Sequence, residues 1–233
     1  MPEHIGVILD GNRRWAEKHY LPPWGGHQIG ADKVEDLLHW CLALNVRTIT
    51  LYLFSTENFN RSKDEIYAIM LLFEERLKKL FSDELIHENQ IQIRAIGRIH
   101  LLPDSIQKLI HTIEEETKNY NDHYLNMAIA YGGRAEIVDA TKKIAQAVTD
   151  GAMTVDGINE STIEEHLYTA FLPKSDPDLI IRTSGEERLS GFLLWQGAYS
   201  ELCFVDVYWP DLRRIDLWRA IRIHQQRDRR YGT

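Results

Sequence analysis

A carboxylate, a glycine, an amide and two arginines follow one another where the first apolar run of the chain ends. Residues 4–9 (His-Ile-Gly-Val-Ile-Leu) lead to Asp10, and residues 11–15 (Gly-Asn-Arg-Arg-Trp) come next. The run is typical of a buried strand, and ligands bind at the carboxyl ends of strands in open α/β sheets. An aspartate there can hold a divalent metal, glycine lets the backbone approach a ligand, and the N–H groups of a following helix favour an anion. The segment therefore predicts a metal-bridged phosphate site; the alternative is a strand-ending turn with a solvated aspartate and arginine.

Three further predicted strands also end in polar or glycine-rich residues. They are 46–54, before Ser55; 124–130, before Gly132; and 179–181, before Arg182. Helical patterns lie between them; one begins after Gly30, and another opens at Ser62, which makes a capping-box signature with Glu65. Strands that alternate with helices imply right-handed crossovers in a mainly parallel sheet. Parallel strands bring their carboxyl ends to one edge. We predict a single α/β domain over residues 1–233, with a central sheet of about six strands flanked by helices and one pocket at that edge.

The composition predicts a globular protein, since 44% of the 233 residues are hydrophobic. A net charge of −8 argues against nucleic acid as a partner, because nucleic-acid binding needs excess basic surface. Arginines must therefore hold any anionic ligand locally. Charges interrupt every apolar stretch before the ~20 residues that span a bilayer, and no leader pattern precedes the first strand, so we expect a cytoplasmic protein. We expect Cys41 and Cys203, which lie in apolar patterns, to be buried free thiols.

Several catalytic and phosphate-binding motifs are absent from the sequence. There is no G-x-x-x-x-G-K-[ST] loop, no G-x-G-x-x-G fingerprint, no H-E-x-x-H and no G-x-S-x-G. Phosphatases with an aspartate nucleophile after the first strand usually have a second aspartate two residues later, where this chain has Asn12. These classes of enzyme are therefore disfavoured.

Five sequence blocks resemble those of cis-prenyltransferases of the undecaprenyl and dehydrodolichyl diphosphate synthase type. The blocks cover nearly the whole chain and are residues 4–15, 54–61, 126–134, 178–190 and 192–201. The resemblance implies that isopentenyl diphosphate adds to an allylic prenyl diphosphate, that diphosphate leaves, and that a cis-polyprenyl diphosphate forms for lipid carrier biosynthesis. It also implies an apolar tunnel between the sheet and the helices. The Pro22-Pro23 pair is similar to archaeal members, whose starters are often geranylgeranyl or longer diphosphates.

The resemblance implies roles for individual residues. Asp10 would be catalytic and bind Mg²⁺, with Glu201 completing the metal site. Asn58 and Ser55 are candidates to relay the proton lost from isopentenyl diphosphate, although neither is a strong base at neutral pH, and the leaving diphosphate is the alternative acceptor. Substrate binding would involve Gly11, Asn12, Arg13, Arg14, Trp15, His27, Ser55, Thr56, Glu57, Phe59, Arg61, Arg182, Arg188, Leu189, Ser190 and Arg230. The terminal Arg230-Tyr231-Gly232 is similar to a segment that reaches a neighbouring subunit, so a homodimer is implied.

The tunnel and its neighbourhood show where the chain departs from the family. Apolar helix faces that would line the tunnel, or else pack as ordinary core, are Leu37, Leu38, Cys41, Ile66, Ile69, Met70, Phe73 and Leu77. Leu53 stands where the family often has Ala, and each buried methylene contributes roughly 0.8 kcal/mol; we hypothesise that the bulk of Leu53 shortens the tunnel and the product. Pro23 replaces an arginine of many relatives near the allylic site, and Gly191 replaces a common Asn near the isopentenyl site.

Two other functions stay open at this point. The altered allylic loop permits a head-to-middle condensation of two allylic diphosphates, as in a few relatives. Other relatives are non-catalytic partner subunits, but these lack the metal aspartate and the phosphate arginines, which this chain has. Peripheral contact with a membrane would come through the lipid product.

Overall fold

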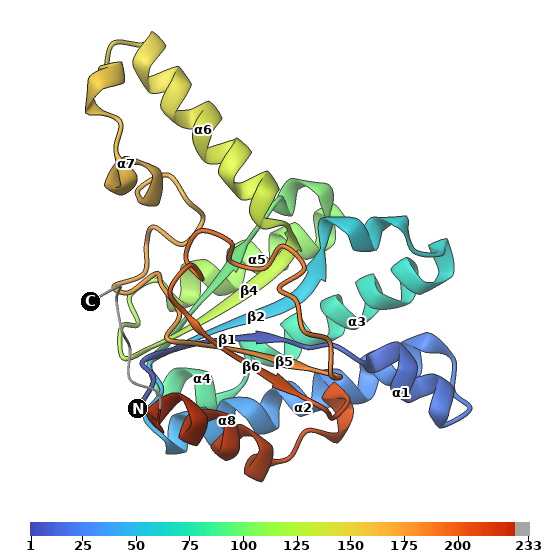
Figure 1. Ribbon diagram of the computed structural model, residues 1–233. Coiled ribbons are helices and arrows are strands. Elements are labelled where there is room, and N and C mark those ends of the chain that lie inside the picture. The colour runs from blue at the N-terminus through green and yellow to red at the C-terminus, as the bar shows by residue number, and fades with distance from the viewer. Residues whose placement is uncertain (227–233) are drawn as a thin grey trace.

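The computed structural model describes residues 1–226, in which six parallel strands form one sheet (Figure 1). The strands are β1 (His4–Ile8), β2 (Thr48–Ser55), β3 (Ile91–Ile96), β4 (His123–Tyr131), β5 (Leu179–Thr183) and β6 (Glu201–Val205). Their order across the sheet is β3-β4-β2-β1-β5-β6, and each neighbouring pair is parallel. The predicted α/β class and the sheet of about six strands are confirmed.

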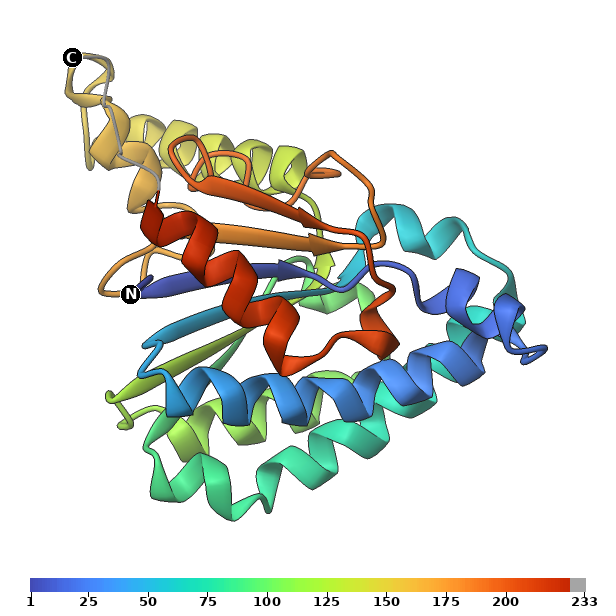
Figure 2. The ribbon, with the colours of Figure 1, turned by 60° about the horizontal axis from the view of Figure 1, so that its bottom comes forward.

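The helices differ in how closely they cover the sheet (Figure 2). They are α1 (Asn12–Lys18), α2 (Pro23–Ala43), α3 (Lys63–Phe81), α4 (Glu84–Glu88), α5 (Asp104–Thr117), α6 (Gly133–Thr149), α7 (Glu160–Glu164) and α8 (Arg214–Gln226). Buried residues of α2, α3, α5 and α8 form the larger core with one face of the sheet. A smaller core on the other face includes Phe192 and Leu193 from the segment after β5. Figure 1 shows α6 and α7 projecting away from the sheet. None of the helices in residues 1–226 is long and apolar enough to cross a membrane.

Helix α2 starts earlier than the apolar periodicity indicates. The repeat of apolar residues begins after Gly30, yet the helix begins at Pro23, in the first-turn position that proline favours. Gly26 and Gly30 lie one turn apart where α1 crosses: a Cβ on Gly26 would stand 2.0 Å from the Asn12 carbonyl oxygen, and one on Gly30 would stand 2.2 Å from Asn12 Oδ1. Close packing against α1 therefore offsets the low helix propensity of these glycines.

Three polar residues cross the middle of the sheet. His4 on β1 lies at 2.8 Å, Nε2 to Oγ1, from Thr50 on β2, which also accepts a hydrogen bond from Asn126 on β4 at 3.0 Å. All three are buried. Burial lowers the pKa of His4 to about 4, so the imidazole is neutral at pH 7.

The carboxyl ends of β4, β2, β1 and β5 lie next to one another. These are the four strands whose polar ends the sequence predicts to form a pocket. The topology therefore brings the segments after Ile8, Ser55, Tyr131 and Thr183 to one edge, as predicted.

Candidate active site

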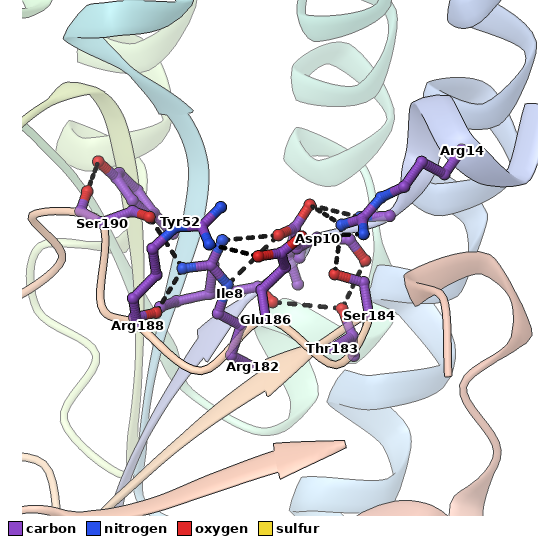
Figure 3. A network of polar contacts seen from close by, with 12 residues as sticks. Ile8, Asp10, Arg14, Tyr52, Arg182, Thr183, Ser184, Glu186, Arg188 and Ser190 are labelled. Carbon is purple, nitrogen blue, oxygen red and sulfur yellow. Dashed lines mark hydrogen bonds and ion pairs between the residues drawn. The ribbon is translucent and has the colours of Figure 1, made fainter. Parts of the chain in front are cut away.

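Asp10 lies just beyond β1 and is held by two arginines (Figure 3). Its Oδ2 accepts hydrogen bonds from Arg182 Nη2 at 2.7 Å and Nε at 3.3 Å, and its Oδ1 accepts one from the Gly11 amide at 2.7 Å and lies 3.4 Å from Arg14 Nη2. Burial alone raises the pKa of Asp10. The hydrogen bond and charge of Arg182, with Arg14 and the Gly11 amide, outweigh burial, so the pKa of Asp10 is lowered. The carboxylate is therefore ionised at neutral pH.

Arg182 connects Asp10 to the segment after β5. It stands opposite Ile8 in the register of β1 and β5, and its side chain is only 5% exposed. Its Nη1 donates to Ser190 Oγ at 2.8 Å and also to the Arg188 carbonyl oxygen. Ser190 has a positive φ of 48°, an uncommon backbone conformation for a residue with a side chain. The guanidinium therefore fixes both the acid and a strained turn beside it.

Arg14 and Arg188 share a second acid, Glu186. Arg14 donates to Glu186 Oε1 at 3.0 Å and to Ser184 Oγ at 2.7 Å, and Arg188 also pairs with Glu186. With Asp10 and Arg182, this network contains three arginines and two carboxylates. Its positive excess, on side chains that are 40% exposed for Arg14 and 63% exposed for Arg188, suits a polyanion.

A second cationic cluster surrounds Glu65 of α3. Glu65 Oε1 accepts a hydrogen bond from Arg61 at 2.9 Å, and it lies 3.3 Å from His27 Nε2 and 3.6 Å from Arg13 Nε. The carboxylate is 4% exposed and does not line the cavity, whereas its three partners do. Burial lowers the pKa of His27. The positive charge of Arg61 lowers this pKa as well, whereas the hydrogen bond and charge of Glu65 raise it. Sequence reasoning missed Glu65 as a site residue, because it identified this residue only through its capping-box spacing from Ser62.

Gly11 packs closely against a tyrosine ring, whereas the sequence predicts that this glycine lets the backbone approach a ligand. Its φ is 104°, and a Cβ there would stand 2.7 Å from the Tyr208 ring. The same ring faces the Arg14 guanidinium, 5.7 Å from the ring centroid. Glycine is therefore required to let the segment after β6 pack against the start of α1.

The other predicted residues fall into two groups. Those that line the cavity are Asp10, Gly11, Asn12, Arg13, Arg14, His27, Ser55, Thr56, Glu57, Asn58, Arg61, Arg182 and Ser190. Those that do not are Trp15, Phe59, Arg188, Leu189 and Glu201. Trp15 Nε1 donates to Asp211 at 2.8 Å, Phe59 packs edge-on against Phe54, and Leu189 packs against the smaller core. Arg230 lies outside the described residues.

Glu201 lies at the opposite edge of the sheet from Asp10. It is the first residue of β6, whereas Asp10 follows the end of β1. Ile8, Arg182 and Phe204 share one level of the register, so Asp10 is about five residues further along, roughly 16 Å at ~3.3 Å per residue. Ligand oxygens lie only ~2.1 Å from Mg²⁺. The prediction that Asp10 and Glu201 share an ion is therefore wrong within one chain.

Asp10 by itself fits one known mode of Mg²⁺ binding. No group of three or more His, Cys, Asp or Glu side chains that could hold a metal occurs within residues 1–226. Mg²⁺ is usually bound through one or two carboxylates together with substrate phosphates and waters. An ionised, 28% exposed carboxylate that lines a cavity beside arginines matches this donor set, provided that a diphosphate supplies further oxygens.

One cavity of about 1480 Å³ joins the polar edge to an apolar tunnel. The tunnel runs between α2, α3 and the sheet, and Leu53 lies in its wall. Of the predicted lining residues, Leu38, Ile69, Phe73 and Leu77 do line it. Leu37, Cys41, Ile66 and Met70 do not; they pack in or against the larger core, which is the alternative that the sequence leaves open for these helix faces. The volume exceeds the roughly 300–1,000 Å³ of ordinary small-molecule pockets.

Comparison with known proteins agrees with the geometry. The prenyltransferase family model for undecaprenyl diphosphate synthases matches residues 8–232. Tritrans,polycis-undecaprenyl-diphosphate synthases (geranylgeranyl-diphosphate specific) from Methanopyrus kandleri and Methanocaldococcus jannaschii are 55% and 52% identical to the chain. Both alignments cover the whole of this chain; they cover 85% of the first relative's length and 83% of the second's. The crystal structure of lavandulyl diphosphate synthase from Lavandula x intermedia, with dimethylallyl diphosphate, has a TM-score of 0.94 and 35% identity, covering 100% of this chain and 98% of that one. The chain belongs to the undecaprenyl diphosphate synthase family of cis-prenyltransferases.

Proposed function

We propose that this chain condenses isopentenyl diphosphate with geranylgeranyl diphosphate and makes a linear cis-polyprenyl diphosphate. The names of the archaeal relatives specify the geranylgeranyl starter, and identity above 50% over the whole chain supports carrying that preference over. The observation that carries the proposal is the single cavity in which a cationic edge continues into a long apolar tunnel. Such a cavity suits a ligand with a diphosphate head and a hydrocarbon tail.

Each of the two cationic clusters would bind one of the two diphosphates. Arg182 and Ser190, with Arg188 beside them, would hold isopentenyl diphosphate next to Asp10. The cluster around Glu65 would hold the allylic diphosphate, with Arg61, Arg13 and His27 as donors. Both clusters line the same cavity, so the two reacting carbons meet at the polar end of the tunnel.

Asp10 would hold Mg²⁺, which would neutralise the charge of the departing diphosphate. Arg182 keeps Asp10 ionised and pointed into the cavity. Ser55 and Asn58 hold each other through a capping box, in which Asn58 Oδ1 accepts from the Ser55 amide at 3.0 Å. An amide is not a base at neutral pH. We therefore assign Asn58 a positioning role and assign the proton to the departing diphosphate.

The test uses the purified chain alone. It is incubated with Mg²⁺, labelled isopentenyl diphosphate and, separately, dimethylallyl, geranyl, farnesyl and geranylgeranyl diphosphates, and mass spectrometry measures the product lengths. We expect the highest kcat/KM with geranylgeranyl diphosphate. No incorporation with any starter would contradict the proposal and would favour a non-catalytic partner subunit. A preference for a shorter starter would refute geranylgeranyl diphosphate as the allylic substrate, but it would leave the condensation reaction itself in place.

A head-to-middle condensation is the second candidate. It is favoured by the close fold match to lavandulyl diphosphate synthase, at a TM-score of 0.94. NMR of the dephosphorylated product separates the two candidates, because head-to-tail addition gives an unbranched chain and head-to-middle addition gives a branched one. The homodimer stays a prediction, which light scattering of the purified chain tests directly.

A further inference from the structure

The cavity reaches a second group of charged residues far from the diphosphate clusters. Glu35 of α2 and Arg76 and Lys79 of α3 line it, and we refer to these three residues as the charged rim. Glu65, at the polar end, and Lys79 are fourteen residues apart on α3, which corresponds to roughly 21 Å at ~1.5 Å per residue. The charged rim therefore lies well along the tunnel from the site of bond formation.

The charged rim lies where the cavity comes close to solvent. Lys79 lines the cavity although its side chain is 55% exposed, and His39 also lines it and is exposed. Glu35 lines it with 40% of its side chain exposed. Side chains that contact both the cavity and solvent form a wall that is one side chain thick. At the charged rim, between α2 and α3, the tunnel therefore comes within one side chain of water.

Ion pairs hold the charged rim together across the two helices. Lys79 Nζ lies 2.5 Å from Glu35 Oε1, and Arg76 Nη1 lies 2.7 Å from Asp32 Oδ1 and 3.6 Å from Glu35 Oε1. Arg76 Nε is buried and has no hydrogen-bond partner within residues 1–226. The tunnel wall, which is apolar at Leu38, Phe73 and Leu77, thus carries a set of fixed charges at the charged rim, where Leu80 also lines the cavity.

The geometry points to the charged rim as the element that ends chain growth. This inference rests on the proposed function, because it concerns the tail of a growing polyprenyl product. Each added isoprene unit is favourable while it lies against apolar wall, since hydrocarbon is removed from water. Beyond the charged rim the next unit would displace water from Arg76 and Lys79 and would then emerge into solvent. Both changes are unfavourable. Product length is therefore set by an electrostatic and hydration barrier, with Leu53 limiting the room available before it.

The alternative is that Arg76 and Lys79 only lay their alkyl stems along the tunnel and join α2 to α3 through surface ion pairs. A matched pair of variants separates these interpretations. The first is Glu35→Met/Arg76→Met/Lys79→Met, which makes the charged rim apolar at similar side-chain length. The control is Glu74→Met/Lys78→Met, which removes an ion pair at 2.7 Å on the same helix. It serves as a control because neither residue lines the cavity.

Each protein is given geranylgeranyl diphosphate, labelled isopentenyl diphosphate and Mg²⁺, and total incorporation and product length are measured separately. We expect the rim variant to make products longer by at least one isoprene unit, while the control keeps the wild-type distribution. Circular dichroism checks that both variants fold; should the triple variant fail to fold, Arg76→Met alone is expected to lengthen the product. Unchanged or shorter products with normal incorporation, or equal lengthening in the control, would overturn the inference. Absence of incorporation by the wild-type chain would instead contradict the proposed function.

Discussion

Replacing Asp10 by asparagine tests the link between the proposed metal-binding carboxylate and the arginine behind it. The substitution preserves shape and removes one charge. Arg182, whose side chain is 5% exposed, then loses the ionised partner of its hydrogen bonds at 2.7 and 3.3 Å but keeps Ser190. A hydrogen bond to a charged group contributes roughly 1.5–3 kcal/mol. We therefore expect Asp10→Asn to lower the free energy of unfolding by about 2 kcal/mol.

For a domain of this size, 1 kcal/mol shifts Tm by roughly 2–4 °C, so the expected decrease is about 4–8 °C. The measurement is thermal denaturation in EDTA, where no metal contributes to either protein. Inorganic pyrophosphate without metal is expected to raise the Tm of the variant more than that of the wild type, because Arg182 lacks its internal partner. Turnover with Mg²⁺ is expected to be lost.

The control for this experiment is Asp36→Asn. Asp36 pairs with Lys33 at 2.7 Å, but its side chain is 51% exposed, and such surface pairs contribute little. Its Tm and turnover should match those of the wild type. An Asp10→Asn protein that melts at the wild-type temperature would refute the proposed support of Arg182 by Asp10. Wild-type turnover in that protein would remove Asp10 from the mechanism.

Three further outcomes are expected. Glu65→Gln should raise KM for the allylic diphosphate about tenfold and KM for isopentenyl diphosphate less, because Arg61 loses the charge-assisted hydrogen bond of roughly 1.5 kcal/mol that orients it, whereas Arg182 in Asp10→Asn is still positioned by Ser190; an equal rise for both substrates in steady-state assays would contradict the division of the two clusters. Burial lowers the pKa of His4 from 6.5 to about 4, so the unfolded chain binds the extra proton and stability falls as pH drops from 6.5 to 4. The free energy of unfolding, measured by urea denaturation, should fall by about 3 kcal/mol over this pH range, and His4→Asn should make that decrease smaller. An unchanged pH dependence in the variant would exclude His4 as its source. Leu53→Ala should lengthen products on mass spectrometry by adding room before the charged rim, and identical lengths would reject the steric role of Leu53.

The direction of the strands made much of the site predictable from the sequence. Asp10 and Arg182 are 172 residues apart, yet both stand at the carboxyl ends of predicted parallel strands, and such ends share an edge. The same rule places Glu201 elsewhere. It precedes the apolar residues of β6, so a parallel sheet must bring it to the amino-terminal edge. Within one chain, the metal pair inferred from family resemblance was thus incompatible with the strand polarity that correctly placed Asp10.

Two features depend on contacts that a linear pattern does not encode. The spacing of Ser62 and Glu65 predicts a helix cap, which the structure confirms through the Glu65 amide at 3.3 Å. The same spacing does not indicate that the Glu65 carboxylate points toward α2 and meets His27. Likewise, the early start of α2 depends on Gly26 fitting against α1, a tertiary contact that overrides helix propensity.

Asp10 and Glu65 carry the same charge and similar partners, but their exposure assigns them different tasks. Each stands among cations that would repel one another in the protein without ligand. Asp10 is 28% exposed and lines the cavity, so a cation bound to diphosphate can reach its oxygens. Glu65 is 4% exposed and lies behind Arg61, so it can orient that arginine but cannot meet a substrate. Mg²⁺ is therefore expected on Asp10, while Glu65 acts on the allylic diphosphate only through the side chains that it orients.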